Sequence, residues 1–139
     1  MSENRRVLIV PCSGIGKTYG TVGREAAYSL AEDLRPESAE VIALSLLVLG
    51  DEDLRARIRM APAITIDGCK LACASQMVAE SGGRVAYQAN VLDTFRRNRT
   101  LRPKGISRLN PDGQALARKL AEELAEATDK IMKADLPES

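Results

Sequence analysis

The chain has 139 residues, with 20 basic and 19 acidic side chains that give a net charge of +1 at pH 7. This length fits one domain with a single core, and the balanced charge provides no overall attraction to nucleic acid or to an anionic membrane. The sequence contains no Trp, no His and only one Phe, which excludes aromatic platforms for stacked bases, histidine bases and zinc sites that use imidazole.

The N-terminal segment is polar up to Arg6 and then apolar from Val7 to Val10. This apolar run is too short for a signal-peptide core or a membrane span, so we expect a cytoplasmic protein with no membrane partner. Three cysteines in such a reducing compartment favour metal binding or thiol chemistry over a disulfide framework.

The first half of the chain alternates apolar runs with helical patterns. Arg6–Val10, stopped by Pro11, predicts a strand buried on both faces. The glycine-rich residues 12–20 are typical of a strand-to-helix turn. The following helix, ended by Pro36, is indicated by apolar residues at every fourth position: Val22, Ala26, Leu30 and Leu34.

A second strand is predicted over Ala39–Ser45, with Leu46–Leu49 continuing apolar. The carboxylates at 51–53 then suit a helix N-terminus, which carries partial positive charge. We expect this short helix to bury Leu54 and Ile58.

A third strand, Ala63–Ile66, leads through the turn at 67–69 into a helix from about Lys70 to Ser81, which Gly82 and Gly83 end. A fourth strand covers about Arg84–Val91. A basic loop is predicted over 92–109.

The last element is a long helix over 111–134. Asn110 followed by Pro111 is typical of an N-cap and first turn. The apolar stripe of this helix predicts core packing, and it consists of Leu116, Leu120, Leu124 and Ile131. Strands and helices that alternate in this way predict a single three-layer α/β domain over residues 1–139, with a parallel four-stranded sheet in the order 2-1-3-4 and right-handed crossovers.

Cysteines follow two neighbouring strands of the predicted sheet. In an open parallel sheet, ligands bind beyond the carboxyl ends of the strands where the strand order reverses, which here lies between strands one and three. Cys12 and Cys69 follow these strands, and Cys73 lies one helical turn after Cys69. The three thiols can therefore converge on one metal ion or one substrate. The alternative is that they are buried small hydrophobic residues.

The glycine-rich turn is either an anion-binding loop at the N-terminus of a helix or a plain tight connection between a strand and a helix. The phosphate-loop motif of nucleotide-binding proteins fails, because Pro11 stands where its first glycine belongs, and the dinucleotide fingerprint fails at Tyr19. Lys17 and the helix N-terminus both favour the thiolate form of Cys12. The candidates for anion binding are Ser13, Gly14, Gly16, Lys17 and Thr18.

Three motifs, covering about residues 6–95, carry a resemblance to a known family. They are Pro11-Cys12-Ser13-Gly14, the helix entry from Gly20 to Tyr28, and Ile64-Thr65-Ile66-Asp67-Gly68-Cys69 with Cys73 four residues later. In these motifs the chain resembles the DGC-domain family of zinc-binding proteins. The resemblance implies a four-cysteine zinc site of which Cys12, Cys69 and Cys73 match three positions. The fourth cysteine of the family would stand at the end of strand two, where this sequence has Ala43, with Ser45 nearby.

Zinc held by three thiolates needs a fourth donor, and without histidine the choices are a carboxylate, water, an exogenous thiol or a partner residue. Asp67 and Asp93 are the nearest carboxylates. The alternative for Asp67 is to accept amide hydrogens as a turn or helix cap, and for Asp93 to cap the basic loop. An open fourth position would make the ion a Lewis acid or a thiol-binding centre. Thiolate sites also hold iron–sulfur clusters.

Two classes of function remain open. The first is a zinc-binding protein in a thiol or sulfur pathway. It would bind a small anion or a thiol as a further ligand. The second is a thiol enzyme or phosphocarrier-like protein with Cys12 as nucleophile and the glycine loop as anion site. We do not expect nucleic acid as a partner. The basic segment Arg96–Arg108 is either a solvated segment or recognises a phosphate, an acidic partner protein or RNA. Arg24 is a candidate to approach the cysteine site.

Overall fold

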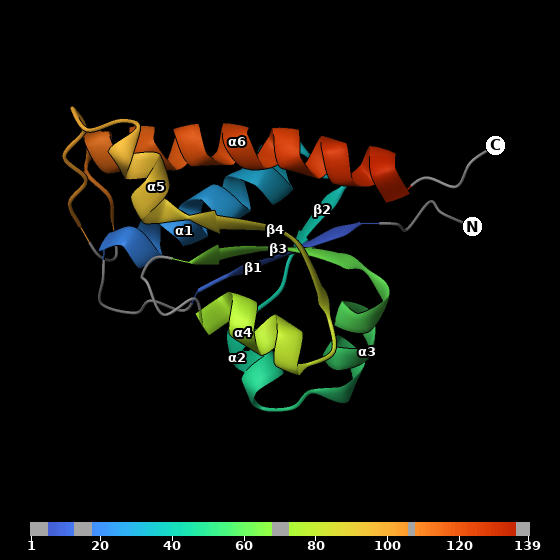
Figure 1. Ribbon diagram of the computed structural model, residues 1–139. Coiled ribbons are helices and arrows are strands. Elements are labelled where there is room, and N and C mark those ends of the chain that lie inside the picture. The colour runs from blue at the N-terminus through green and yellow to red at the C-terminus, as the bar shows by residue number, and fades with distance from the viewer. Residues whose placement is uncertain (1–5, 13–17, 68–72, 106–107, 136–139) are drawn as a thin grey trace.

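The computed structural model describes residues 6–12, 18–67, 73–105 and 108–135, and Figure 1 shows a sheet with helices on both of its faces. All strand pairs are parallel, and the order is β2-β1-β3-β4. The predicted α/β class and strand order are therefore confirmed. The strands are β1 (Val7–Pro11), β2 (Ala39–Val41), β3 (Pro62–Asp67) and β4 (Arg84–Asn90).

The helices formed by the described residues lie on both faces of the sheet. In Figure 1, α1, α5 and α6 lie on one face and α2, α3 and α4 on the other. The helices are α1 (Thr18–Ser29), which continues into a π-helical turn (Leu30–Leu34), α2 (Leu44–Val48), α3 (Glu52–Met60), α4 (Cys73–Glu80), α5 (Val91–Arg96) and α6 (Pro111–Asp135).

The alternation of side chains along β1 divides the core into two layers. Val7 and Ile9 pack with the α1 and α6 residues, whereas Leu8 and Val10 pack with α2, α3 and α4. Every residue of β1 and β3 is buried. Burial on both faces explains why these strands read as continuous apolar runs.

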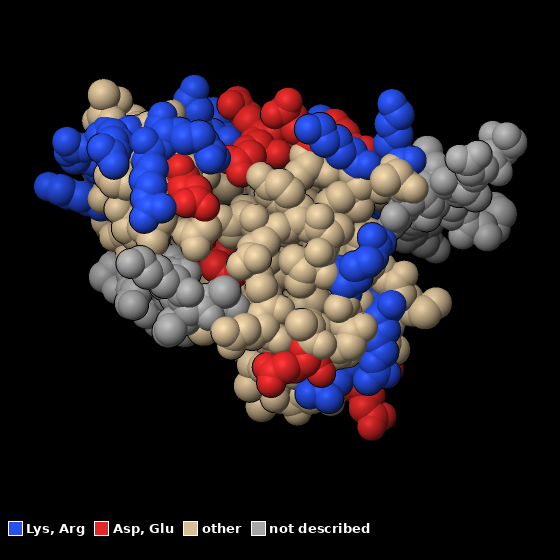
Figure 2. Space-filling view, in the orientation of Figure 1, with Lys and Arg blue, Asp and Glu red and all other residues tan. Residues whose placement is uncertain are grey.

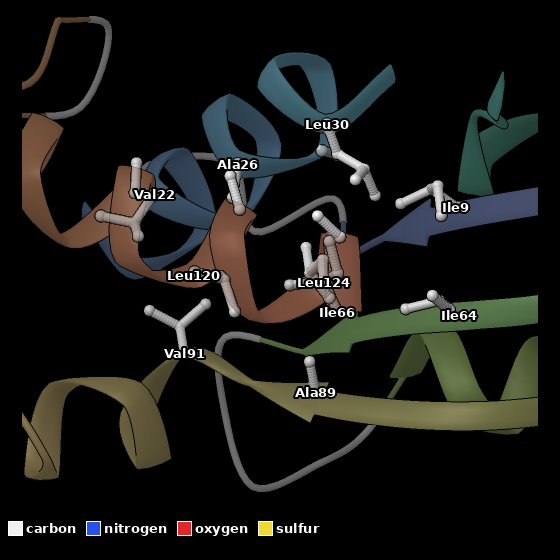
Figure 3. Packing of buried hydrophobic residues seen from close by; sticks show 14 of the residues in the cluster. Ile9, Val22, Ala26, Leu30, Ile64, Ile66, Ala89, Val91, Leu120 and Leu124 are labelled. Atoms are coloured by element: carbon white, nitrogen blue, oxygen red, sulfur yellow. The ribbon is translucent and has the colours of Figure 1, made fainter. Parts of the chain in front are cut away.

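The long helix α6 supplies the largest part of the first layer. Leu116, Leu120 and Leu124 are fully buried, and Figure 3 shows Leu120 and Leu124 among the side chains of α1 and the sheet. The predicted core role of this stripe is confirmed. Ile131, near the C-terminal end of the stripe, is only partly buried.

The predicted end of β2 and the predicted burial of Leu34 were wrong. The strand predicted over Ala39–Ser45 ends at Val41, and α2 begins at Leu44. Leu44 and Leu47 are buried while Val48 is 59% exposed, so the apolar run has helical spacing. Leu34, predicted on the buried face of α1, is 37% exposed, because the π-helical turn alters the angular position of each residue after it.

The segment predicted as a basic loop over 92–109 begins with a helix. Asn90 caps α5 by accepting a hydrogen bond from the Leu92 amide at 2.9 Å, and the helix continues to Arg96. This local bond from a short polar side chain starts a helix in a segment whose charge pattern resembles a loop. The irregular basic segment is therefore shorter than predicted.

The predicted starts of α3 and α6 and the predicted end of α4 are confirmed. Asp51 accepts from the Leu54 amide at 2.9 Å at the start of α3, and Asn110 accepts from the Gly113 amide at 2.8 Å at the start of α6. Gly82 ends α4 with φ +85°, a backbone conformation that residues with a Cβ rarely adopt.

Candidate functional site

Cys12 lies at the carboxyl end of β1, beside the end of β3. Its amide donates to the carbonyl of Ile66 at 2.7 Å, so the strand pairing continues through Cys12. The side chain is 9% exposed.

Asp67, the last residue of β3, holds the first turn of α4. Its fully buried carboxylate accepts from the Ala74 amide and from the Ser75 hydroxyl, both at 3.0 Å. The Ser75 hydroxyl also lies 2.6 Å from that of Thr65. Asp67 thus has the helix-cap role that was its alternative to metal binding, and both of its oxygens already accept hydrogen bonds.

Cys73 is the first residue of α4 and is exposed. Because Asp67 binds the neighbouring Ala74 amide, the start of α4 is fixed at the end of β3. Cys12 follows the adjacent strand. Cys12 and Cys73 are far apart in sequence, but both therefore follow the carboxyl ends of neighbouring strands of the sheet.

Cys69 lies outside the described residues, as do Ser13, Gly14, Gly16 and Lys17. Of the predicted anion-binding residues the structure describes only Thr18, where α1 begins. Within residues 6–12, 18–67, 73–105 and 108–135, no three Cys, Asp or Glu side chains gather closely enough to hold a metal ion. The three-cysteine set depends on Cys69 and remains a prediction.

Asp93, the other carboxylate considered as a fourth ligand, belongs to α5. Its carboxylate accepts from Arg96 Nη1 at 3.2 Å, and both side chains are more than half exposed. The helix α5 follows the outermost strand β4, whereas Cys12 follows β1. Because β3 lies between these two strands, Asp93 and Cys12 follow strands that are not neighbours. Its observed role is an ion pair on its own helix.

A cavity of about 400 Å³ adjoins Cys12. Its lining includes Arg24 and Tyr28 of α1, Ala43 of the connection from β2 to α2, and Ser45 in the first turn of α2. Arg24 and Cys12 thus line the same cavity, and Arg24 Nη2 donates to Thr21 Oγ1 at 3.1 Å. Ala43, the position matched to the fourth family cysteine, faces the same cavity as Cys12.

Sequence reasoning missed Tyr28 and the pair Thr65 and Ser75. No local signal identified Ser75, because its hydroxyl bonds to a carboxylate eight residues earlier in the sequence. Tyr28 gave no such signal, since its place in the cavity depends on how α1 packs beside β2.

Comparison with protein families gives one match. A family model described as the DGC domain matches residues 8–131, which confirms the resemblance and extends it beyond residue 95 into α6. The matched range includes Cys12, Cys69 and Cys73. None of the curated proteins compared with the chain matches it. Among the described helices, none has the length and apolar character needed to cross a membrane.

Proposed function

The chain belongs to the DGC domain family, and from this premise we propose that it binds zinc through the thiolates of Cys12, Cys69 and Cys73. The observation that carries the proposal is the bond from the Asp67 carboxylate to the Ala74 amide at 3.0 Å. This bond holds the start of α4, which carries Cys73, at the end of β3, and β3 is paired with β1, the strand that Cys12 follows. Thiolates are preferred zinc ligands, and a folded edge that gathers them favours release of their protons to a metal.

The cavity beside Cys12 supports an accessible fourth position on the metal. Where the family has another cysteine, this chain has Ala43, whose methyl group cannot bind metal. The cavity of about 400 Å³ lies between Ala43 and Cys12, with Arg24 in its wall. A small anion or an exogenous thiol would fit this space, and the guanidinium of Arg24 would favour a negative charge there. Bound zinc would supply Lewis acidity.

Metal analysis tests the proposal. We expect protein expressed in full length and purified under reducing conditions to contain about one zinc per chain. Cys69→Ser should lose the metal while the sheet survives, because the core is aliphatic and separate from the thiols. Asp93→Asn is the matched control and should keep the metal, since Asp93 pairs with Arg96.

A wild-type protein that contains no zinc and takes up none on titration after reduction would refute the proposal. Unfolding of Cys69→Ser would instead show that the metal is needed for the fold. Iron bound by the same cysteines, detected in the same elemental analysis, would keep the thiolate site but change its cofactor.

The second candidate function is that of a thiol enzyme with Cys12 as nucleophile, and the cavity with Arg24 favours it. The Cys12 thiolate would attack a phosphate ester, forming a P–S bond as the P–O bond breaks and the alcohol leaves, an arsenical, forming an As–S bond as hydroxide leaves, or a disulfide, forming a mixed disulfide as one thiolate leaves. Arg24 and the loop before α1 would hold an anionic substrate. This function needs Cys12 to be reactive without metal.

Thiol labelling separates the two functions. After removal of metal, a limiting alkylating reagent should reach Cys73 first if access alone decides, because Cys73 is exposed and Cys12 is buried. The enzyme hypothesis predicts the reverse order, since the thiolate is the nucleophile. Labelled peptides identified by mass spectrometry over a range of pH provide the measurement. Faster labelling of Cys73 at every pH would contradict the enzyme hypothesis.

A further inference from the structure

A second cavity, of about 500 Å³, lies where α1 and α5 meet the basic segment. It contains none of the residues assigned to the zinc site. Its lining combines two aromatic rings, a leucine and three guanidinium groups: Tyr19, Leu92, Phe95, Arg96, Arg99 and Arg102. Its volume is within the range of pockets for small organic ligands, about 300–1,000 Å³.

Aromatic side chains form one wall of this cavity. The rings of Tyr19 and Phe95 lie 5.8 Å apart between centroids and are tilted by 49°. Both residues are partly buried and pack against the core below them. Phe95 is the only Phe in the chain, and Tyr19 stands in the first turn of α1. The wall is therefore a fixed apolar surface against which a planar ring can stack.

Three arginines surround the aromatic wall, and all three are exposed. Arg96 pairs with Asp93 at 3.2 Å, and Arg102 Nη1 donates to the carbonyl of Leu101 at 3.2 Å. No hydrogen bond or ion pair holds the guanidinium of Arg99 within the described part of the chain. Each guanidinium has five N–H groups, so these contacts leave donors available.

Positive charge gathers around this cavity. Figure 2 shows Lys and Arg side chains clustered over α5 and the segment after it, and residues 91–112 contain six basic side chains against two acidic ones. Arg97 is already paired with Glu123, which also accepts from Tyr87. Because Arg96 is paired with Asp93 as well, the positive charge of the cavity that no ion pair within the described residues balances is that of Arg99 and Arg102.

We propose that this cavity binds a phosphorylated ligand with a planar ring, the chemical class of nucleotides. The ring would stack on Phe95 and Tyr19, and the phosphates would accept hydrogen bonds from Arg99 and Arg102. Guanidinium groups match phosphate oxygens in two-pronged hydrogen bonds. The missing phosphate-loop motif in residues 12–20 does not count against this proposal, because the cavity is lined mainly by the separate segment 92–102.

Calorimetric titration of the full-length protein with ADP, adenosine and inorganic pyrophosphate tests the proposal. ADP should bind best, because only ADP offers both the ring and two phosphates. Arg99→Gln should weaken ADP binding by about tenfold, the usual effect of losing one charge-assisted hydrogen bond. Phe95→Leu should weaken ADP but leave pyrophosphate unchanged. Arg84→Gln, which removes the same charge from the exposed start of β4, is the control and should change neither.

Three results would overturn the proposal. One is absence of ADP binding at millimolar concentration. Another is equal binding of ADP and pyrophosphate with no effect of Phe95→Leu, since the ring would then be irrelevant. The third is binding of a short single-stranded RNA at least a hundredfold tighter than ADP, which would assign the surface to nucleic acid instead.

Discussion

Replacement of Asp67 by Ala should lower the free energy of unfolding by about 3 kcal/mol. The fully buried carboxylate accepts from the Ala74 amide and the Ser75 hydroxyl. Alanine would leave the Ala74 amide buried without its acceptor, and hydrogen bonds to charged groups contribute roughly 1.5–3 kcal/mol each. Part of this loss is offset, because the variant no longer buries a charge. Urea denaturation followed by circular dichroism measures the change.

Asp67→Asn provides the matched comparison. The asparagine carbonyl can still accept from the Ala74 amide, and its NH₂ group can donate to Ser75 Oγ if the Ser75 hydroxyl turns toward Thr65, 2.6 Å away. This variant should therefore lose clearly less stability than Asp67→Ala. If the two variants lose the same amount, the negative charge matters more than the hydrogen-bond geometry. If neither loses stability, Asp67 does not hold α4 to β3.

Hydrogen exchange should show where Asp67→Ala acts. The amides of α4 should exchange faster, while those of β1 and β3 keep their protection, because α4 is attached at this end through Asp67. A uniform increase over the whole chain would instead mean that α4 cannot open separately. The result bears on the proposed zinc site, since Cys73 moves with α4.

Leu124→Ala should destabilise the protein by about 3 kcal/mol, within the range of 2–5 kcal/mol found for buried leucines. Leu124 is fully buried in α6 and belongs to the same buried cluster as Ile66 of β3, part of which Figure 3 shows. Truncation removes apolar contacts and leaves a cavity between α6 and the sheet, which the rigid strand cannot fill. Because helix propensity favours alanine slightly, the loss comes from packing.

Leu49→Ala is the control for Leu124→Ala. The same atoms are removed at a position that is 80% exposed, so the change in stability should stay below about 0.5 kcal/mol. Equal losses at the two positions would contradict the core assignment of α6. A loss at Leu49 alone would indicate that its exposed side chain is covered in solution.

The sequence by itself determined the class of fold and the order of the strands. Fully apolar runs such as Val7–Val10 occur where a strand is covered on both faces, and runs that alternate with amphipathic helices leave few topologies for a parallel sheet. The starts of α3 and α6 were also predictable from the sequence, because Asp51 and Asn110 accept hydrogen bonds from amides only three residues away. The edge of the sheet that carries Cys12 also followed from strand order.

Only the tertiary structure decided which side chains share a cavity. Arg24 and Ser45 lie on different elements, and their place beside Cys12 depends on how α1 and α2 pack against the sheet. The end of β2 at Val41 also depends on tertiary packing. The apolar residues after Val41 could form a strand by composition alone, but a helix is the structure that buries Leu44 and Leu47. Tyr19 and Phe95, far apart in sequence, meet for the same reason. Local patterns determine elements, whereas contacts between elements depend on long-range packing that no short stretch of sequence contains.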